Sequence, residues 1–525
     1  MPARPWLARV GHARAALAVV PGRIGGWTRA RWRTGRGRAI LAAIAALILA
    51  VPSALGLVLA TVLDDDGGGA DVPMTRVATL GVMAPLSGDL SADGTSVRNA
   101  VALAIDEANK SGAIPGWRLE LSTRDDLSRP DGGAQAADAF AANDRLIGVV
   151  GPLSSLVAKV ALPTLSAEGI PVVSPSNADP TLTGAGTDPR TRPYPTYFRL
   201  AGTDELQARV AAEYAVRTLG RRRIAVVDGE PRYGTTLGGR FAVRAAALGA
   251  TVASVYQVQG DGADGSELDS TAEAIEQEAP DLVYVATGAA FAGKLRTRLA
   301  EAGASIQVMG SDALLQPRYT DDAKSAADGD LITSLLVPPT RLSAAGAFVA
   351  DYSERFGGPA DDDGRTTPSG TDSTDASGAS EGNRHAAAPP TATRAQTATP
   401  APARIPASTQ DTASADGDSA AAQRRQAAHD ASVELAQRRA EAIPVAAAYA
   451  YDAARAIIRA AATVLPGRPA VDAAARHDVV AAIGRGSFTG VTGSIGFDRW
   501  GDTRTPRVVL YTVLGGRFVA LTTWT

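Results

Sequence analysis

Two adjacent serines, Ser154 and Ser155, could do chemistry in the stretch VVGPLSSLVAKVALPTL, which begins at Val149. They follow an apolar run and a Gly-Pro step, and the residues after them recur at helical spacing, so the pair could act as a nucleophile, hold a ligand or cap a helix. A serine nucleophile needs a base, and His477 is the only one of four histidines in a segment expected to fold. Lys159 lies one helical turn after Ser155, but nothing else completes a site, and the serines are not in a Gly-x-Ser-x-Gly elbow. The sequence therefore favours a binding protein over an enzyme.

The composition narrows the kind of binding site. The chain has no cysteine and only four histidines, which argues against a thiolate or His-ligated metal site, and we expect neither a metal nor a cofactor. Residues 1–63 hold nine arginines and no acidic residue, whereas the whole chain has a net charge of −3, so the part beyond residue 63 is acidic. An acidic body argues against nucleic-acid binding. A small molecule is the expected ligand.

The N-terminal region predicts the compartment. Residues 39–63 form an uncharged apolar run that is long enough to span a bilayer, with arginines before it and three aspartates directly after it. This charge asymmetry places the N-terminus in the cytoplasm and the rest of the chain outside. We expect a single-pass anchor in the cell membrane with an extracytoplasmic binding domain. A cleaved signal peptide with a small-residue site at residues 58–60 is the alternative.

Strands and helices alternate along two stretches of the chain. The first begins with the strand-like RVATLGVM and a helix that carries Val97, Val101 and Ile105 on one face, and the second begins at RRIAVVDG. Repeated strand-helix units predict an α/β fold in which each stretch forms a parallel sheet covered by helices on both faces. Ligands of such sheets bind beyond the carboxyl ends of the strands, which is where Ser155 is expected.

A low-complexity segment interrupts the second half. Residues 358–430 consist mainly of Ala, Thr, Ser, Pro, Gly, Asp and Arg, with Ile405 as the only large apolar residue. Such a composition cannot bury a core, so we predict a disordered surface insertion. A mucin-like, O-glycosylated tract is the functional alternative.

Nine phrases occur in the order seen in a known family. They are GVMAPLSGDLSADGTSVRNAVALAIDEAN, VVGPLSS, GIPVVSPSNADPTLT, YFRLAGTD, IAVVDGEPRYGTTL, DLVYVATG, IQVMGSD, AYAYDAARAI and TGVTGSIGFDRWGD. In this order the chain resembles the type I periplasmic binding proteins, and most of all their leucine/isoleucine/valine (branched-chain amino acid) branch, the substrate-binding subunits of ABC importers. The resemblance covers about 77–356 and 441–525.

The resemblance implies two Rossmann-like lobes, joined by a three-segment hinge, that close on a small ligand. The expected divisions are a basic cytoplasmic tail at 1–38, a transmembrane helix at 39–63, a linker at 64–76, a first lobe at 77–199, 335–357 and 441–490, a second lobe at 200–334 and 491–525, and the insertion at 358–430.

In the first lobe, the resemblance places ligand contacts at the tips of two strands. Ser155 matches a serine that holds the ligand carboxylate, with Ser154 beside it, and a helix N-terminus independently favours an anion. An N-cap is the structural alternative. Ser176 and Asn177 occupy the next ligand-facing loop, SPSNADP, which could equally be an ordinary turn. Ala178 stands where relatives often have a threonine, so one hydrogen bond to the ligand is missing.

The second lobe is expected to close over the ligand with two side chains. Tyr233 matches a tyrosine that packs over the ligand, and Asp312 matches an acid that takes the ligand ammonium; a tyrosine beside a glycine turn and a helix N-cap are the alternatives. Aromatic residues that line the aliphatic pocket of leucine-type proteins are replaced by Asp93 and by a residue near Gly288. These replacements favour a polar or larger ligand, with Asp93 as a second cation partner or as an exposed loop residue.

The expected function is capture of an amino acid or related compound for an ABC importer. The implied partners are the permease and ATPase subunits of that importer, together with the membrane that holds the N-terminal helix. The alternative is a ligand-sensing ectodomain that signals through a separate membrane partner, since a spanning anchor is unusual for a transport subunit.

Overall fold

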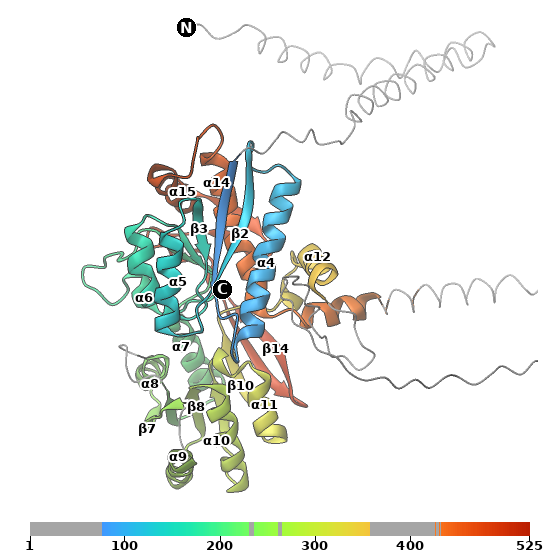
Figure 1. Cartoon of the computed structure of the whole chain (residues 1–525). Helices are drawn as coiled ribbons and strands as arrows, with labels where there is room; N and C mark the ends of the chain where they lie inside the picture. The colour runs from blue at the N-terminus through green and yellow to red at the C-terminus, as the bar shows by residue number, and fades with distance from the viewer. Residues whose placement is uncertain (1–75, 230–235, 261–264, 358–425, 427–429, 431) are drawn as a thin grey trace, which may run out of the picture. The chain divides into compact units, whose positions relative to one another are not determined.

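The computed structural model describes residues 76–229, 236–260, 265–357, 426, 430 and 432–525 (Figure 1). The expected membrane span at 39–63, Tyr233 and nearly all of the expected insertion lie outside these residues. No helix of the described part has both the length and the apolar character needed to cross a membrane.

The first sheet contains five strands, all parallel, in the order β2-β1-β3-β4-β5. These strands are β1 (Arg76–Ala84), β2 (Trp117–Asp125), β3 (Leu146–Val150), β4 (Val172–Ser174) and β5 (Tyr197–Arg199). Because successive side chains of a strand point to opposite faces, neighbouring valines enter different cores. Val149 packs with helices α5 (Pro130–Ala141) and α6 (Ser155–Ala167), whereas Val150 shares its cluster with α4 (Ser91–Lys110) and α14 (Val445–Val464).

The second sheet has seven strands in the order β14-β13-β10-β9-β8-β6-β7. Five are parallel, namely β6 (Arg223–Asp228), β7 (Thr251–Gln257), β8 (Leu282–Ala286), β9 (Gln307–Gly310) and β10 (Leu331–Ser334). The last two, β13 (Val508–Leu514) and β14 (Arg517–Trp524), are antiparallel. Helices α7 (Asp204–Glu213) and α8 (Leu237–Ala247) bury one face, and α9 (Gly265–Glu278) and α10 (Ala289–Glu301) bury the other. The predicted α/β architecture with two covered sheets is confirmed.

The remaining elements connect and cover the two sheets. They are α11 (Pro317–Ala323), α12 (Gly346–Phe356), helical residues 432–441, α15 (Ala473–Arg485) and the hairpin of β11 (Ser487–Gly490) and β12 (Gly493–Gly496). Short 3₁₀ helices lie at Pro180–Thr183, Asp312–Leu314, Lys324–Ala327 and Pro339–Arg341, and a π-helical segment at Tyr214–Thr218 continues α7. Helices α12 and α14 both pack on α4, so segments late in the chain return to the first sheet.

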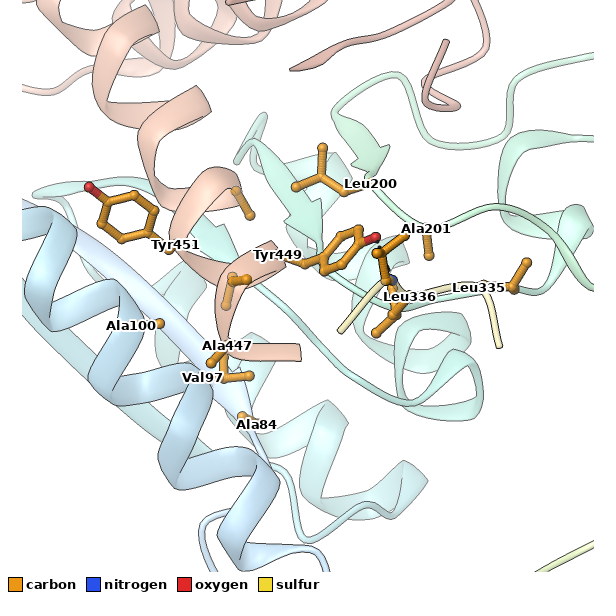
Figure 2. Packing of buried hydrophobic residues seen from close by; sticks show 14 of the residues in the cluster. Ala84, Val97, Ala100, Leu200, Ala201, Leu335, Leu336, Ala447, Tyr449 and Tyr451 are labelled. Carbon is orange, nitrogen blue, oxygen red and sulfur yellow. Dashed lines mark hydrogen bonds between the residues drawn. The ribbon is translucent and has the colours of Figure 1, made fainter. Parts of the chain in front are cut away.

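Within the described residues, the chain passes between the sheets after β5, after β10 and before β13. Apolar side chains join the first two passages to α14: Tyr449 lies beside Leu200 and Leu336 in the buried cluster (Figure 2). The Tyr449 hydroxyl accepts a hydrogen bond of 2.9 Å from the Val337 backbone N–H. The passages are therefore packed and hydrogen-bonded parts of the core rather than free linkers.

Candidate functional site

The serine pair lies where β3 turns into α6. Gly151 ends the strand with a φ of 112°, and a Cβ at this position would stand 2.0 Å from the Met83 carbonyl oxygen, so the turn requires glycine. Ser154 is the N-cap of α6, since its Oγ accepts a hydrogen bond of 3.2 Å from the Leu156 N–H. The sequence alternative of an N-cap is thus correct for the first serine of the pair.

Ser155 has a different set of partners. Its Oγ accepts hydrogen bonds from the backbone N–H groups of Ala178, at 3.2 Å, and Asp179, at 3.3 Å. A serine oxygen has two lone pairs and one proton, so these two bonds leave its O–H as a donor. Neither that proton nor the Ser155 N–H has an acceptor within the described residues, and the side chain is partly exposed. Ser155 can therefore donate two hydrogen bonds to an anionic group at the positive end of α6.

The loop after β4 is tied to the serine turn by its own side chains. Asn177 is fully buried, and its Nδ2 donates to the carbonyl oxygens of Pro152, at 3.1 Å, and Leu153, at 2.8 Å. Its Oδ1 accepts a 3.1 Å hydrogen bond from the Tyr197 hydroxyl. The Ser176 hydroxyl donates to the same Leu153 oxygen at 3.1 Å. These bonds bring Ser154, Ser155, Ser176 and Asn177 together, but the amide of Asn177 faces the protein, which leaves the loop's exposed groups for a ligand.

Lys159 pairs with an acid of this loop. Its Nζ lies 2.5 Å from Asp179 Oδ2, and both side chains are largely buried. Burial acts to raise the pKa of Asp179, but the hydrogen bonds from Lys159 and Thr181 outweigh it and hold that pKa below its usual value. This ion pair ties α6 to the loop after β4 and so helps to fix the loop beside Ser155.

Asp93 lies in the first turn of α4, at the same edge of the first sheet. This placement follows because β1, which precedes α4, is the parallel neighbour of β3. The Asp93 carboxylate is partly exposed and has no partner within the described residues, and burial raises its pKa. An acceptor without a partner can take a cationic or hydrogen-bond-donating group.

Asp312 lies at the carboxyl edge of the second sheet, just after β9. It begins a short turn whose N-cap is Ser311, so it is not itself the cap. Burial raises the pKa of Asp312, and no cation pairs with it in the described part of the chain. Its Oδ1 accepts a 3.3 Å hydrogen bond from Gln207 Nε2, which also donates to the Thr333 carbonyl oxygen at 2.8 Å.

Two residues near this edge were not predicted from the sequence. Gln207 on α7 is fully buried and its Oε1 has no partner in the described residues, and the same holds for Thr287 Oγ1 at the tip of β8. Gly288 follows as the N-cap of α10, with no side chain to cap it. A glutamine placed on the apolar face of α7, one turn before Ala211, is the sequence signal that could have revealed the first of them.

Two α/β units, one with a parallel and one with a mainly parallel sheet, carry polar groups at the carboxyl edges of both sheets and define the class of two-lobed solute-binding proteins. A family model described as "Periplasmic binding protein" matches residues 78–379. A Leu/Ile/Val-binding protein of Rhizobium johnstonii, BraC3, is 31% identical over 277 residues, which are 52% of this chain and 72% of the relative. The leucine-specific-binding protein of Salmonella typhimurium is 28% identical over 267 residues, covering 50% of this chain and 68% of the relative.

Solved structures share the fold. A leucine-binding protein, LivK, of Thermotoga maritima superposes with a TM-score of 0.58 at 18% identity, over 85% of this chain and 98% of that one. A type 1 periplasmic binding protein of Bordetella pertussis gives a TM-score of 0.59 at 18% identity, over 85% of this chain and 100% of that one. The chain belongs to the periplasmic binding protein family, in the branch of the Leu/Ile/Val-binding proteins. The predicted family is thereby confirmed, and the protein is an extracytoplasmic solute-binding protein rather than an enzyme.

Proposed function

We propose that this protein captures a small amino-acid-like ligand between its two lobes and delivers it to an ABC importer. One observation carries the proposal: Ser155 presents an O–H and an N–H without acceptors in the described residues, at the N-terminus of α6 and at the carboxyl edge of the first sheet. Relatives at 28–31% identity are named for leucine, isoleucine and valine.

The first lobe holds the carboxylate of the ligand. Ser155 donates its O–H and N–H to the carboxylate oxygens, and Ser154 stands beside it with its own hydroxyl proton. The partly exposed Ser176 lines the next loop, which the buried Asn177 holds in place. Because Ala178 has no hydroxyl, the loop offers the ligand one hydrogen bond fewer than a threonine would.

The second lobe recognises the ammonium group. Asp312 has no cation of its own in the described residues, and its carboxyl is disfavoured as an anion by burial. A ligand ammonium beside it lowers the pKa of Asp312 again and stabilises the charged form, so the binding energy is released only when the lobes close. Tyr233, which lies outside the described residues, packs over the ligand in this scheme.

The side-chain pocket is polar rather than purely aliphatic. Asp93 stands at one wall, its carboxylate unpaired among the described residues, and the small Gly288 stands at another as the N-cap of α10. These residues offer charge and hydrogen-bonding groups where a leucine side chain needs apolar contact. We therefore propose an amino acid with a polar or larger side chain, or a related compound.

The chain's division into parts completes the proposal. Lobe one is formed by 77–199, 335–357 and 441–490 and lobe two by 200–334 and 491–525, with the passages between the sheets as a hinge. Residues 39–63 tether the protein to the cell membrane beside the permease and ATPase subunits. Residues 358–430 form an insertion that leaves and re-enters the first lobe.

A thermal-shift panel tests the proposed function. Amino acids, their amides and small organic acids are added to the full chain, and a ligand that binds the folded state should raise the melting temperature. Asp312→Ala should then weaken ammonium-bearing ligands by about 2 kcal/mol or more if the pair is buried.

Asp328→Ala, a change at an exposed aspartate of the same lobe, is the control and should leave affinity unchanged. No stabilisation by any member of the panel would remove the proposed function, and an unchanged affinity in Asp312→Ala would remove the ammonium site.

A further inference from the structure

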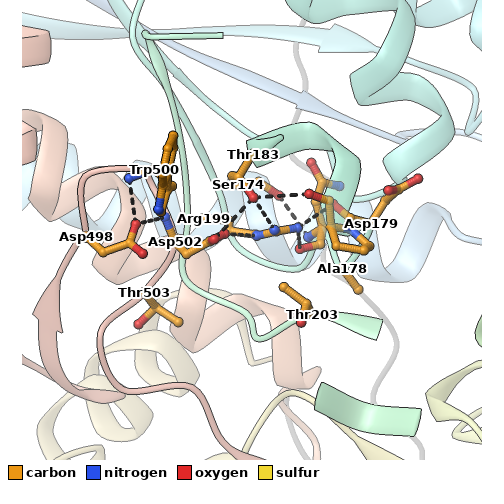
Figure 3. A network of polar contacts seen from close by, with 12 residues as sticks. Ser174, Ala178, Asp179, Thr183, Arg199, Thr203, Asp498, Trp500, Asp502 and Thr503 are labelled. Atoms are coloured by element: carbon orange, nitrogen blue, oxygen red, sulfur yellow. Dashed lines mark hydrogen bonds and ion pairs between the residues drawn. The ribbon is translucent and has the colours of Figure 1, made fainter. Parts of the chain in front are cut away.

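A fully buried arginine connects the candidate ligand loop to a passage between the sheets. Arg199 ends β5 with none of its side chain exposed, and a buried cation is tolerated only when its hydrogen bonds are satisfied. Its Nε lies 2.7 Å from Asp502 Oδ1, its Nη1 donates to the Asp179 carbonyl oxygen at 2.6 Å, and its Nη2 donates to Thr183 Oγ1 at 2.7 Å (Figure 3). One guanidinium thus holds two segments that are more than 300 residues apart in the sequence.

The Asp502 side of this contact is a turn that is held by its own hydrogen bonds. Asp498 Oδ1 accepts hydrogen bonds from the N–H groups of Trp500, at 2.8 Å, and Asp502, at 2.9 Å. The Gly501 carbonyl oxygen accepts a 3.0 Å bond from the Arg199 N–H, and Arg190 adds a second guanidinium 2.8 Å from Asp502 Oδ2. This turn lies between β12 and β13, in the passage that leads to the second sheet. Arg199 therefore anchors that passage to the first lobe.

The other side of the contact reaches the candidate ligand residue. Asp179 is bound at both of its backbone groups, because its carbonyl oxygen accepts from Arg199 and its N–H donates to Ser155 Oγ. The hydrogen bonds form an unbroken series from Ser155 through Asp179 and Arg199 to Asp502. A ligand that accepts a hydrogen bond from the Ser155 hydroxyl changes the first bond of the series, between Ser155 and Asp179. A movement of the passage before β13 changes the last bond, between Arg199 and Asp502.

We propose that Arg199 is a positioning residue that couples ligand contact at Ser155 to the movement of the passage before β13. The inference rests on the proposed function for the identity of the ligand, but the restraint on the passage exists without one. Coupling between two sites needs one structural element whose position depends on both of them. The planar guanidinium of Arg199 is that element, because it is bound to Asp179 on the ligand side and to Asp502 in the passage.

The experiment compares two buried arginines in the full chain. Arg199→Met removes the guanidinium and its hydrogen bonds. Arg199→Lys keeps a positive charge near Asp502 but not the planar guanidinium that binds both segments. Arg476→Met is the matched control, because Arg476 is also buried and donates to two first-lobe carbonyl oxygens, of Leu146 and Asn143, both at 3.0 Å, at the amino end of β3. Two fluorophores report the distance between the sheets; the chain has no cysteine, so Glu168→Cys and Ala302→Cys give the only thiols.

We expect Arg199→Met to broaden the distance distribution without ligand, to lower ligand affinity about tenfold and to reduce the distance change on binding. Arg199→Lys should restore part of each effect, and Arg476→Met should lower the melting temperature while leaving all three readouts within about twofold of the parent. If Arg199→Met does not fold, Asp502→Asn and Thr183→Val replace it.

Two results would overturn the inference: a ligand-free distribution in the Arg199 variants as narrow as in the parent, or an equal broadening in Arg476→Met. Failure of the proposed function would give a different result. The parent protein would bind no member of the ligand panel, but the ligand-free distance distribution would still be broader in Arg199→Met than in Arg476→Met.

Discussion

The carboxyl edges of the two sheets differ in how their buried polar groups are satisfied. Around α6 in the first lobe, the amide of Asn177 uses both its nitrogen and its oxygen, and Arg199 uses all three nitrogens. Around Asp312 in the second lobe, Gln207 Oε1 and Thr287 Oγ1 are buried without a partner in the described residues. A buried polar group without a hydrogen bond costs about 1–3 kcal/mol. The first edge is preorganised to bind a ligand. At the second edge, the unpartnered groups would gain hydrogen bonds from a ligand held between the closed lobes, so binding should stabilise this edge more.

Asn177→Ala should have the largest effect, because it breaks the preorganised edge. The change leaves the Pro152 and Leu153 carbonyl oxygens and the Tyr197 hydroxyl without the amide, so we expect the free energy of unfolding to fall by about 3 kcal/mol. Urea denaturation measures it. Ser176→Ala removes only one bond to the Leu153 oxygen and serves as the control, with an expected loss of about 1 kcal/mol. Equal losses in both variants would contradict the preorganised loop.

Much of the fold, but less of the site, could be predicted from the sequence. Strand-helix alternation depends on neighbouring residues, and it correctly indicated both sheets and the helix that starts after Ser154. The contact of Arg199 with Asp502 spans 303 positions, and no local pattern in YFRL indicates that its arginine is buried. Similarly, the SPSNADP loop predicts a turn but does not show that Asn177 points into the protein.

Asp126 is an exception in the first lobe, and it predicts a pH dependence. It is fully buried after β2 with Oδ2 unpartnered in the described residues, and burial, helped by the nearby charge of Asp125, raises its pKa to about 6. The folded state therefore keeps a proton that the unfolded chain has lost, so this group's contribution to stability falls as pH rises from about 4 to about 6.

Asp126→Asn should remove this part of the pH profile and raise the free energy of unfolding at pH 7 by roughly 2 kcal/mol relative to the parent. Urea denaturation at a series of pH values measures it. A parent profile that rises through the same window would show that Asp126 is ionised and paired in the folded protein.

Asp312→Asn should separate stability from binding at the second edge. Burial raises the pKa of Asp312, so its ionised form is disfavoured in the ligand-free protein, and stability is lost as pH rises through the folded-state pKa. The variant should be more stable than the parent at neutral pH, yet bind ammonium-bearing ligands more weakly. Thermal melts with and without ligand measure both effects, and a variant that is less stable without ligand would argue for a structural role.

Thr287→Val should have the smallest effect. Replacing an unpartnered hydroxyl by a methyl group of similar size removes no hydrogen bond in the described residues, so the free energy of unfolding should change by less than about 0.5 kcal/mol or rise slightly. If the ligand reaches this hydroxyl, affinity should still fall. A destabilisation of about 1 kcal/mol or more would show that Thr287 already has a partner, and the contrast between the two edges would weaken.

The central claim is that the first lobe captures a carboxylate at Ser155 and the second lobe an ammonium at Asp312. Calorimetric titration of the full chain with each amino acid of the panel, and with the amide of each, tests it most directly. The account predicts at least one amino acid that binds with a negative heat-capacity change and whose amide binds about tenfold or more weakly, because Ser155 then faces no anion. An amide that binds as tightly as its amino acid, or no binding by any amino acid, would contradict it.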